Sequence, residues 1–241
     1  MPQIWPSKSS ISSADKSEQG YGRSPASQQN KLRITEVFVS LQGESSRVGL
    51  PTVFVRLTGC PLRCQYCDTA YAFSGGRLQA IDELIEQVRS YGVRQVCVTG
   101  GEPLAQRGCV DLLRSLCDAG LEVSLETSGA LDIRPVDARV KRVVDIKTPG
   151  SGECEKNRMG NLDALCATDE LKFVICNRQD YDWAVMLLNQ HKLSKRCPVL
   201  FSPSFAQVSE TELADWIIAD RLPVRFQTQL HKRLWGDVAG H

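Results

Sequence analysis

Three cysteines close together are the residues of this chain with the most distinctive potential chemistry. Cys60, Cys64 and Cys67 lie in the stretch TGCPLRCQYCDTAY, residues 58–71. A closed structural metal site needs four ligands, whereas three thiolates that hold a cluster of four irons leave one iron without a protein ligand. Such an open position is typical of a reactive metal centre. A zinc site completed by a distant His or Cys is the alternative, because cysteines two residues apart also occur in zinc sites.

Three further segments carry polar groups at the ends of predicted strands. VTGGEP (98–103) has two glycines, whose bare backbone allows a ligand to approach closely, and a carboxylate, Glu102, that could accept a hydrogen bond from an ammonium group. ETSG (126–129) offers a carboxylate and hydroxyls suited to a ribose, and DIKTPG (145–150) offers a charged and hydroxylated turn. Each could instead be an ordinary turn or a helix cap.

The elements that must position these groups alternate along the chain. Predicted strands, many of them continuous β-branched apolar runs, cover residues 33–39, 52–57, 95–100, 122–127, 142–147, 171–176, 198–203 and 224–230. Between them, amphipathic helices are predicted at 78–92 and 109–120, which end at Gly92 and Gly120. Strand then helix, repeated about six times, indicates a mostly parallel α/β sheet with right-handed crossovers.

The length of the chain limits the kind of sheet. About 210 residues are available for the fold, whereas a full eightfold barrel takes about 250, so a partial (β/α)6-type barrel or an open sheet is expected. Ligands of both forms bind at the C-terminal ends of the strands. The cysteine loop follows the strand that ends at Leu57 and should therefore lie at that edge.

Composition indicates one core domain and a small ligand. The chain has 241 residues, 42% of them apolar, and 29 Lys and Arg against 28 Asp and Glu, so no charge excess favours nucleic acid or a membrane surface. Residues 1–30 carry eight serines and three prolines, which predicts a disordered tail before a domain at 31–241. A transit peptide is the rival interpretation of the tail, but its Asp15 and Glu18 argue against one.

The ten cysteines and the absence of a long apolar run predict a cytoplasmic protein. In a reducing compartment, clustered cysteines more often hold metal than form disulfides. The other cysteines are scattered among apolar residues, which predicts inert thiols of the core. They are Cys97, Cys109, Cys117, Cys154, Cys166, Cys176 and Cys197.

The spacing Cys-x3-Cys-x2-Cys, with an aromatic residue (Tyr66) before the third cysteine, resembles the radical S-adenosylmethionine (SAM) superfamily. The resemblance implies a [4Fe-4S] cluster on Cys60, Cys64 and Cys67, whose open iron is chelated by SAM. In that superfamily one electron cleaves SAM to methionine and a 5′-deoxyadenosyl radical, which takes a hydrogen from the substrate. The SAM contacts that the resemblance implies are Tyr66, Cys67, Asp68, Gly101, Glu102, Ser128, Lys147, Thr148 and Pro149.

A narrower resemblance lies in residues 40–69, SLQGESSRVGLPTVFVRLTGCPLRCQYCDT, which are similar to the 7-carboxy-7-deazaguanine synthase family. The similarity runs from about Leu32 to Trp235 and includes FSPSF (201–205) and QLHKRLWG (229–236). It implies that 6-carboxy-5,6,7,8-tetrahydropterin is converted to 7-carboxy-7-deazaguanine and ammonia, on the route to 7-deazapurines such as queuosine. In that family the hydrogen is returned, so that SAM is a recycled cofactor.

The resemblance also implies a substrate site, formed by Leu41, Gln42, Gly43, Arg56 and Thr99. A glutamine amide can read the edge of a pterin, and a guanidinium matches a carboxylate in bidentate geometry. The alternatives are a turn at Gln42 and a surface ion pair at Arg56. An Arg without a partner inside the apolar run TVFVRL would be costly.

Thr69 is implied as a ligand of Mg²⁺, which would bridge to the substrate carboxylate. Its hydroxyl is of the kind that binds magnesium in phosphate-binding loops, and a helix-capping Thr is the alternative. The resemblance further implies a homodimer and an external flavodoxin-like or ferredoxin-like electron donor. The terminal residues GDVAGH depart from the family pattern, in which a short tail often reaches the site.

Two other functions fit parts of the sequence. A glycyl-radical-enzyme activating enzyme has a similar length and cysteine loop but acts on a partner protein, and the segment SLQGE argues against it. A non-catalytic metal-binding or nucleic-acid-binding module is disfavoured by the balanced charge and by the absence of a basic and aromatic stripe.

Overall fold

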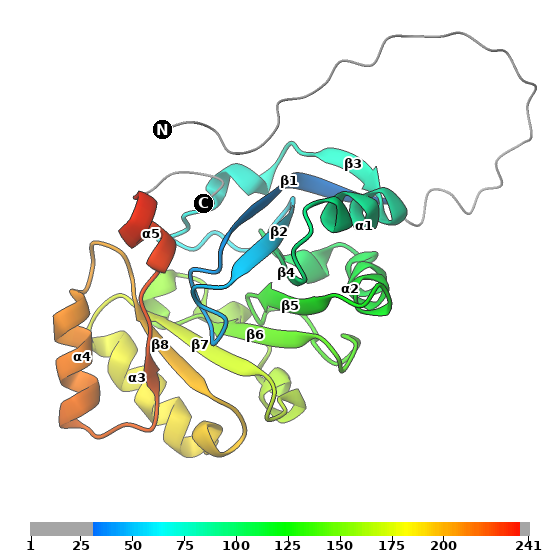
Figure 1. Cartoon of the computed structure of the whole chain (residues 1–241). Coiled ribbons are helices and arrows are strands. Elements are labelled where there is room, and N and C mark those ends of the chain that lie inside the picture. Colours follow the sequence, from blue (N-terminus) through cyan, green and yellow to red (C-terminus); the bar gives the residue numbers. More distant parts are fainter. Residues whose placement is uncertain (1–30, 237–241) are drawn as a thin grey trace, which may run out of the picture.

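The computed structural model describes residues 31–236, whose strands form a single curved sheet (Figure 1). The strands are β1 Lys31–Leu41, β2 Pro51–Leu57, β3 Arg77–Ala80, β4 Gln95–Gly100, β5 Glu122–Thr127, β6 Lys141–Ile146, β7 Glu170–Ile175, β8 Val199–Pro203 and β9 Arg225–Phe226. Their order across the sheet is β3-β1-β2-β4-β5-β6-β7-β8-β9. β1 is antiparallel to both of its neighbours, and every other pair is parallel. The prediction of a mostly parallel, incomplete barrel is confirmed.

Helices cover the sheet in two groups, with α1 and α2 beside one half and α3 and α4 beside the other (Figure 1). They are α1 Ile81–Ser90, α2 Cys109–Asp118, α3 Arg178–Gln190, α4 Glu210–Ala219 and a short α5 Leu230–Trp235. Each half has its own apolar core. In α1 the buried positions Ile81, Leu84 and Val88 follow the helical period, so burial of this face against the sheet holds the helix in place.

The structure differs from the sequence-based prediction in an edge strand, in the length of the last strand and in two connections between strands. Residues 78–80, expected to begin a helix, belong instead to the edge strand β3 on β1, and Leu78 is 59% exposed there. The predicted strand at 224–230 shortens to the two residues of β9. No α-helix joins β5 to β6 or β6 to β7, where described residues 128–140 and 147–169 form loops, turns and 3-10 helices. The strand-helix repeat is therefore less regular than predicted.

The cysteines outside the cluster loop are not all inert core thiols. Cys97, Cys109, Cys176 and Cys197 are buried as predicted, but Cys166 is exposed. It lies in the turn before β7, where Asp169 is directed inward instead. The prediction of a core thiol at Cys166 is wrong.

The predicted tail at 1–30 and the terminal GDVAGH fall largely outside the described residues. The division of the chain into a tail and a domain at 31–241 therefore stays a prediction. Within residues 31–236, no helix is both long and apolar enough to cross a membrane.

Candidate active site

A cavity of about 680 Å³ lies at the C-terminal ends of the parallel strands. Six neighbouring strands each contribute a polar side chain to its wall, among them Arg56, Thr99, Glu126, Asp145, Lys172 and Ser202. Register brings some of them together directly, because Arg56 is paired with Thr99 and Asp145 with Lys172 across adjacent strands. Parallel strands thus place one row of charged and hydroxylated groups on a single inner face.

The cysteine loop forms another wall of this cavity. Cys60, Cys64 and Cys67 are half-buried and all line it. The loop is fixed by backbone hydrogen bonds, since Gly59 N donates to Ala72 O at 2.7 Å and Glu102 N donates to Gly59 O at 2.8 Å. The predicted edge position of the loop is therefore observed.

The close approach of the GGE segment to the cysteine loop explains a glycine. A Cβ on Gly101 would lie 2.2 Å from Gly59 O and 2.9 Å from Cys60 Cβ, so no larger residue fits without moving the loop. Gly101 also lines the cavity, as expected of a backbone that a ligand approaches. This contact joins the first two predicted SAM segments physically.

The three thiols of the cysteine loop and the polar groups beside them are the donors available to a cluster. Among residues 31–236, no group of three His, Cys, Asp or Glu side chains is arranged to hold a single metal ion. Two polar atoms near the loop, Tyr66 Oη and Asp145 Oδ1, are buried without a hydrogen-bond partner in the described part of the chain. Buried polar groups are normally paired, so these two are available to a ligand. The donor set and these open groups fit a cluster with bound SAM.

Most of the predicted SAM residues surround the cavity, and three do not. Tyr66, Cys67, Asp68, Gly101, Ser128 and Lys147 line it, whereas Glu102, Thr148 and Pro149 do not. Glu102 is fully buried, and its carboxylate accepts hydrogen bonds from Leu104 N, from Thr127 Oγ1 at 2.9 Å and from Ser128 N at 2.7 Å. In this structure Glu102 ties the end of β4 to the end of β5, and its contact with an ammonium group stays a prediction.

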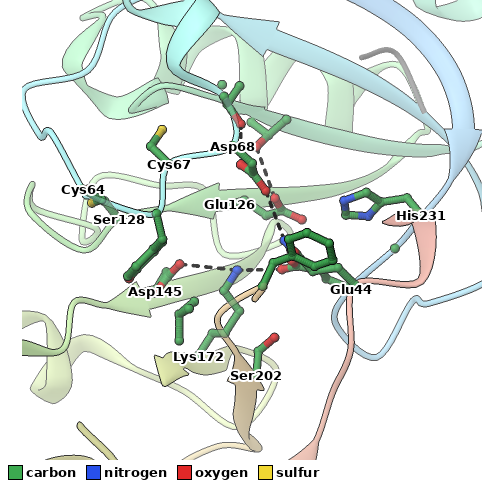
Figure 2. Close-up of a pocket in the computed structure, with 18 of the residues that line it drawn as sticks. Glu44, Cys64, Cys67, Asp68, Glu126, Ser128, Asp145, Lys172, Ser202 and His231 are labelled. Atoms are coloured by element: carbon green, nitrogen blue, oxygen red, sulfur yellow. Dashed lines mark hydrogen bonds and ion pairs between the residues drawn. The ribbon is translucent and has the colours of Figure 1, made fainter. Parts of the chain in front are cut away.

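A chain of buried charges crosses the cavity, and the sequence analysis did not single out its central members. Figure 2 shows Lys172 between Asp145 and Glu44. The ammonium lies 2.6 Å from Glu44 Oε2 and 3.4 Å from Asp145 Oδ2, and Asp145 also meets Lys147 at 3.0 Å. Burial by itself would lower the pKa of Lys172, but Glu44 and Asp145 outweigh it and raise that pKa well above 10.5.

Glu126, whose carboxylate was expected to suit a ribose, contacts two of the predicted substrate residues. Its carboxylate accepts hydrogen bonds from Gln42 Nε2 at 3.3 Å and from Thr99 Oγ1 at 3.2 Å. Burial and the nearby charge of Glu44 raise its pKa above the ordinary 4.5. The predicted substrate residues Gln42 and Thr99 therefore meet on one carboxylate, which the sequence analysis had assigned to another role.

Arg56 lines the cavity but is not free of partners. Its Nε donates to Glu36 Oε1 at 2.7 Å, and the Tyr71 hydroxyl donates to the same oxygen at 2.8 Å. The guanidinium carbon lies 5.8 Å from the ring centroid of Phe38 and 5.8 Å from that of Tyr71. Within the described residues its two terminal nitrogens have no hydrogen-bond partner. Arg56 thus forms the ion pair that was the alternative interpretation, through Nε, while its two terminal nitrogens remain available to a ligand.

Helix α5 adds a wall that sequence reasoning missed. His231 lines the cavity on the side opposite Cys64 and Cys67 (Figure 2). A Cβ on Gly43 would lie 2.1 Å from His231 Nδ1, so this glycine is required by close packing. Burial lowers the pKa of His231 below its ordinary 6.5. The segment QLHKRLWG carried the only signal for these residues, through the resemblance.

Thr69 lies at the cavity next to a strongly anionic group. Its hydroxyl donates to Asp68 Oδ1 at 2.8 Å, and Asp68 Oδ2 meets Lys232 at 3.2 Å. Burial would raise the pKa of Asp68, but Lys232 and the hydrogen bonds from Thr69 and Gln229 lower it to about 2. Hydroxyl and carboxylate oxygens are ligands that Mg²⁺ accepts.

Comparison with known proteins agrees with this geometry. Residues 54–147 match the family model described as Radical SAM superfamily. The 7-carboxy-7-deazaguanine synthase of Chlorobaculum tepidum is 45% identical over 211 residues, which cover 86% of this chain and 96% of that protein. The 7-carboxy-7-deazaguanine synthase of Koribacter versatilis is 42% identical over 219 residues, with 85% and 97% covered.

A solved structure shares the fold. The crystal structure of QueE from Escherichia coli superposes with a TM-score of 0.66 at 24% identity, and the match covers 83% of this chain and 95% of that one. The segments that carry the sequence resemblance therefore lie in one cavity within a shared fold. The chain belongs to the 7-carboxy-7-deazaguanine synthase family of the radical SAM superfamily.

Proposed function

We propose that this chain converts 6-carboxy-5,6,7,8-tetrahydropterin to 7-carboxy-7-deazaguanine and ammonia. The observation that carries the proposal is the single cavity in which the cysteine loop faces Arg56, Glu126 and Lys172. One wall suits a cluster and SAM, and the opposite wall suits an anionic, nitrogen-rich ring. Family membership favours this reaction over activation of a glycyl-radical enzyme and over a non-catalytic metal-binding module.

Cys60, Cys64 and Cys67 would hold the [4Fe-4S] cluster, and SAM would lie against the residues around them. When bound, these groups supply a reversible hydrogen abstraction from the substrate. Tyr66 and Lys147 stand together at this wall, with the Lys147 ammonium 5.7 Å from the ring centroid of Tyr66. Lys147 is held by Asp145, so the cation is already oriented before a ligand arrives.

The substrate would be held by two opposite charges. The free terminal nitrogens of Arg56 offer a bidentate match to its carboxylate. Glu126 is positioned by Gln42 and Thr99 and would accept hydrogen bonds from the amino and ring N–H groups of the pterin. Leu41 and Gly43 line the same part of the cavity. This pairing fixes the ring at both ends, which is the requirement for one hydrogen to face the SAM side.

Mg²⁺ would bind at Thr69 and bridge to the substrate carboxylate. The adjacent Asp68 supports this proposal, because its carboxylate stays ionised through the physiological pH range. Thr69→Ala should weaken magnesium stimulation more than SAM binding. The same Mg²⁺ dependence in variant and parent would remove Thr69 as a ligand.

The electron donor would be an external flavodoxin-like or ferredoxin-like protein, because the cluster must receive one electron from outside. The family resemblance also supports a homodimer, which sedimentation of the purified chain would test. A cytoplasmic location stays a prediction from the cysteine content.

The decisive experiment is an anaerobic assay with the reconstituted chain, a chemical reductant, SAM, Mg²⁺ and carboxytetrahydropterin. We expect 7-carboxy-7-deazaguanine and ammonia in equal amounts, with many product molecules formed for each SAM lost. SAM consumed once per turnover, or no ring-contracted product from a chain that contains iron and sulfide, would contradict the proposal.

A further inference from the structure

Asp180 is a buried carboxylate that the proposed reaction does not use. It lies in the first turn of α3, directly after β7, and is 0% exposed. Its Oδ1 accepts a hydrogen bond from Gly150 N at 2.7 Å, and its Oδ2 accepts from Cys176 N at 3.0 Å and lies 3.0 Å from Thr148 Oγ1. Within residues 31–236 it has no ion-pair partner. Its hydrogen bonds connect the end of β6 to the end of β7.

The turn held by Asp180 is the predicted SAM segment DIKTPG. Gly150 approaches the carboxylate so closely that a Cβ would lie 2.3 Å from Asp180 Oδ2. Gly150 therefore has to be a glycine for a packing reason, because its backbone is not left-handed. The position of the turn depends directly on the position of Asp180.

The same turn is in contact with the cysteine loop. Gln65, which lies between Cys64 and Tyr66, donates from its backbone N to Ser151 O at 3.1 Å, and its side-chain amide donates to Gly150 O. A further bond runs from Arg63 N to Glu153 Oε1 at 2.6 Å. Two residues of the turn thus lie between Asp180 and the middle of the cysteine loop.

We infer that Asp180 is a positioning residue, which sets the turn at 147–151 against the cysteine loop and so shapes the SAM side of the cavity. The inference rests on the proposed function for the identity of the ligand. An unpaired carboxylate is costly to bury, and here each oxygen instead accepts hydrogen bonds from groups of the turn or the adjoining strand. That arrangement fixes three chain segments relative to one another at the functional edge.

Asp169 provides a matched control at the other end of the same strand. It is also buried, directly precedes β7, and accepts hydrogen bonds from Cys166 N and from Arg142. It contacts neither the cysteine loop nor the turn at 147–151. A general loss of stability should follow from either substitution, whereas an effect on the SAM side should follow only from a change at Asp180.

The test compares Asp180→Asn with Asp169→Asn in the anaerobically reconstituted enzyme. An Asn amide cannot accept hydrogen bonds at both terminal atoms, so one donor of the turn or of Cys176 loses its partner. We expect the dissociation constant of SAM to rise at least tenfold in Asp180→Asn and less than twofold in Asp169→Asn. Hydrogen exchange should be faster in residues 60–67 and 147–153 in Asp180→Asn alone.

Gly150→Ala gives a second route to the same change, because its methyl group must push the turn away from Asp180. It should weaken SAM binding and accelerate exchange at 60–67, and it should not be additive with Asp180→Asn. Loss of the cluster from Asp180→Asn but not from Asp169→Asn would also support the inference.

Parental SAM affinity and parental exchange in 60–67 after Gly150→Ala would overturn the inference, as would equal changes in the two Asp variants. These readouts do not depend on product formation. A parent chain that binds SAM but makes no ring-contracted product would overturn the proposed function and leave the role of Asp180 decided by exchange.

Discussion

The two edges of the sheet bury charges in different ways. At the N-terminal edge, the Arg142 guanidinium donates two hydrogen bonds to Asp169, from Nε to Oδ1 at 2.9 Å and from Nη2 to Oδ2 at 2.5 Å. Beside this pair, Lys141 Nζ lies 2.9 Å from Oε1 of the buried Glu170. At the C-terminal edge, Lys172 is shared between two carboxylates, and Asp145 Oδ1 has no hydrogen-bond partner among residues 31–236. The charges at the N-terminal edge are matched in pairs, whereas those at the C-terminal edge face the cavity and are only partly matched.

This difference separates charges that hold the fold from charges that await a ligand. An unsatisfied buried polar group costs about 1–3 kcal/mol, so a fold has no reason to keep several together unless a ligand completes them. Within residues 31–236, Tyr66 Oη and Asp145 Oδ1 are two of six buried side-chain atoms without a partner, and both residues line the cavity, as does Arg56 with its open terminal nitrogens. The other four, Ser40 Oγ, Gln79 Oε1, Gln95 Oε1 and Gln227 Nε2, belong to uncharged residues that do not line it. Among the charged side chains, incomplete pairing is therefore found at the functional edge, in Asp145 and Arg56, and not in the pairs compared at the other edge.

The largest expected effect comes from a cysteine at the functional edge. Cys64→Ala should abolish SAM cleavage, because two thiolates do not hold a four-iron cluster with a single open iron. Cys166→Ala is the control, since this exposed thiol lies in the turn before β7 at the opposite edge. Iron and sulfide analysis with an assay for 5′-deoxyadenosine measures both. A Cys64→Ala protein with four irons and parental cleavage would contradict the assignment.

The second comparison concerns two arginines whose side chains are mostly covered, Arg56 at 14% and Arg142 at 11% exposure. Arg56→Lys keeps a charge beside Glu36 but loses the fork, so kcat/KM should fall roughly 30-fold or more, which corresponds to at least about 2 kcal/mol. Arg142→Lys loses the fork on Asp169 and the bonds to the carbonyls of Ile133 and Ala164. It should lower the free energy of unfolding by about 2–3 kcal/mol and leave kcat/KM near parental.

Steady-state kinetics and urea unfolding on the same preparations separate the two roles. SAM affinity should barely change in Arg56→Lys, because the proposed contact is with the substrate. A destabilised Arg56→Lys enzyme with parental kcat/KM would show that the pair with Glu36 is its whole role.

Much of this organisation could be predicted from sequence because it depends on local pattern. Continuous apolar runs gave β2 and β4 within one or two residues, and the cysteine spacing identified the loop that β2 positions. Residues 77–80 could not be assigned in the same way. Leu78 fits the apolar period of α1, but pairing with β1 holds it in a strand, and that pairing is a tertiary interaction.

The central charges of the cavity were harder to predict for a different reason. Lys172 lies inside the apolar run LKFVIC, and only the curvature of the sheet brings it to Glu44, which is 128 residues earlier in the chain. Glu102 was predicted from a motif, yet its carboxylate points to Thr127 and Ser128 rather than into the cavity. A motif locates a segment, but side-chain direction depends on neighbours distant in sequence.

The pH dependence of stability should show a smaller difference between the two edges of the sheet. Burial and the charge of Glu44 raise the pKa of Glu126 above 4.5, so ionising this carboxyl group in the folded state costs free energy. The unsubstituted chain therefore loses stability as the pH rises from 4.5 through the raised pKa of Glu126. Burial alone would raise the pKa of Asp169, but Arg142 and the Cys166 groups lower it below 3.8. Its contribution is therefore present above 3.8 and lost as pH falls through the lowered value.

Two substitutions should accordingly show opposite trends. The stability of Glu126→Gln relative to the parent should improve as pH rises above 4.5. The deficit of Asp169→Asn should be fully present at neutral pH and shrink below pH 3.8. Urea midpoints measured from about pH 3 to about pH 8 give both curves. Parallel curves would mean that the two carboxylates lie in equivalent environments, contrary to the comparison.

The smallest expected effect concerns two exposed residues held in the left-handed backbone region, Lys192 with φ 50° in the connection before β8 and Ala206 with φ 62° in the connection after it. Glycine adopts this region without strain, and its greater freedom in the unfolded chain offsets part of the gain. Lys192→Gly and Ala206→Gly should each raise the free energy of unfolding by about 0.5–1 kcal/mol.

The kinetics of the two variants should differ, because Phe205 and Gln207, which flank Ala206, line the cavity. Ala206→Gly should raise KM about twofold by loosening that wall, whereas Lys192→Gly should leave KM unchanged. Equal KM values in the two variants would show that the β8–α4 connection does not shape the site.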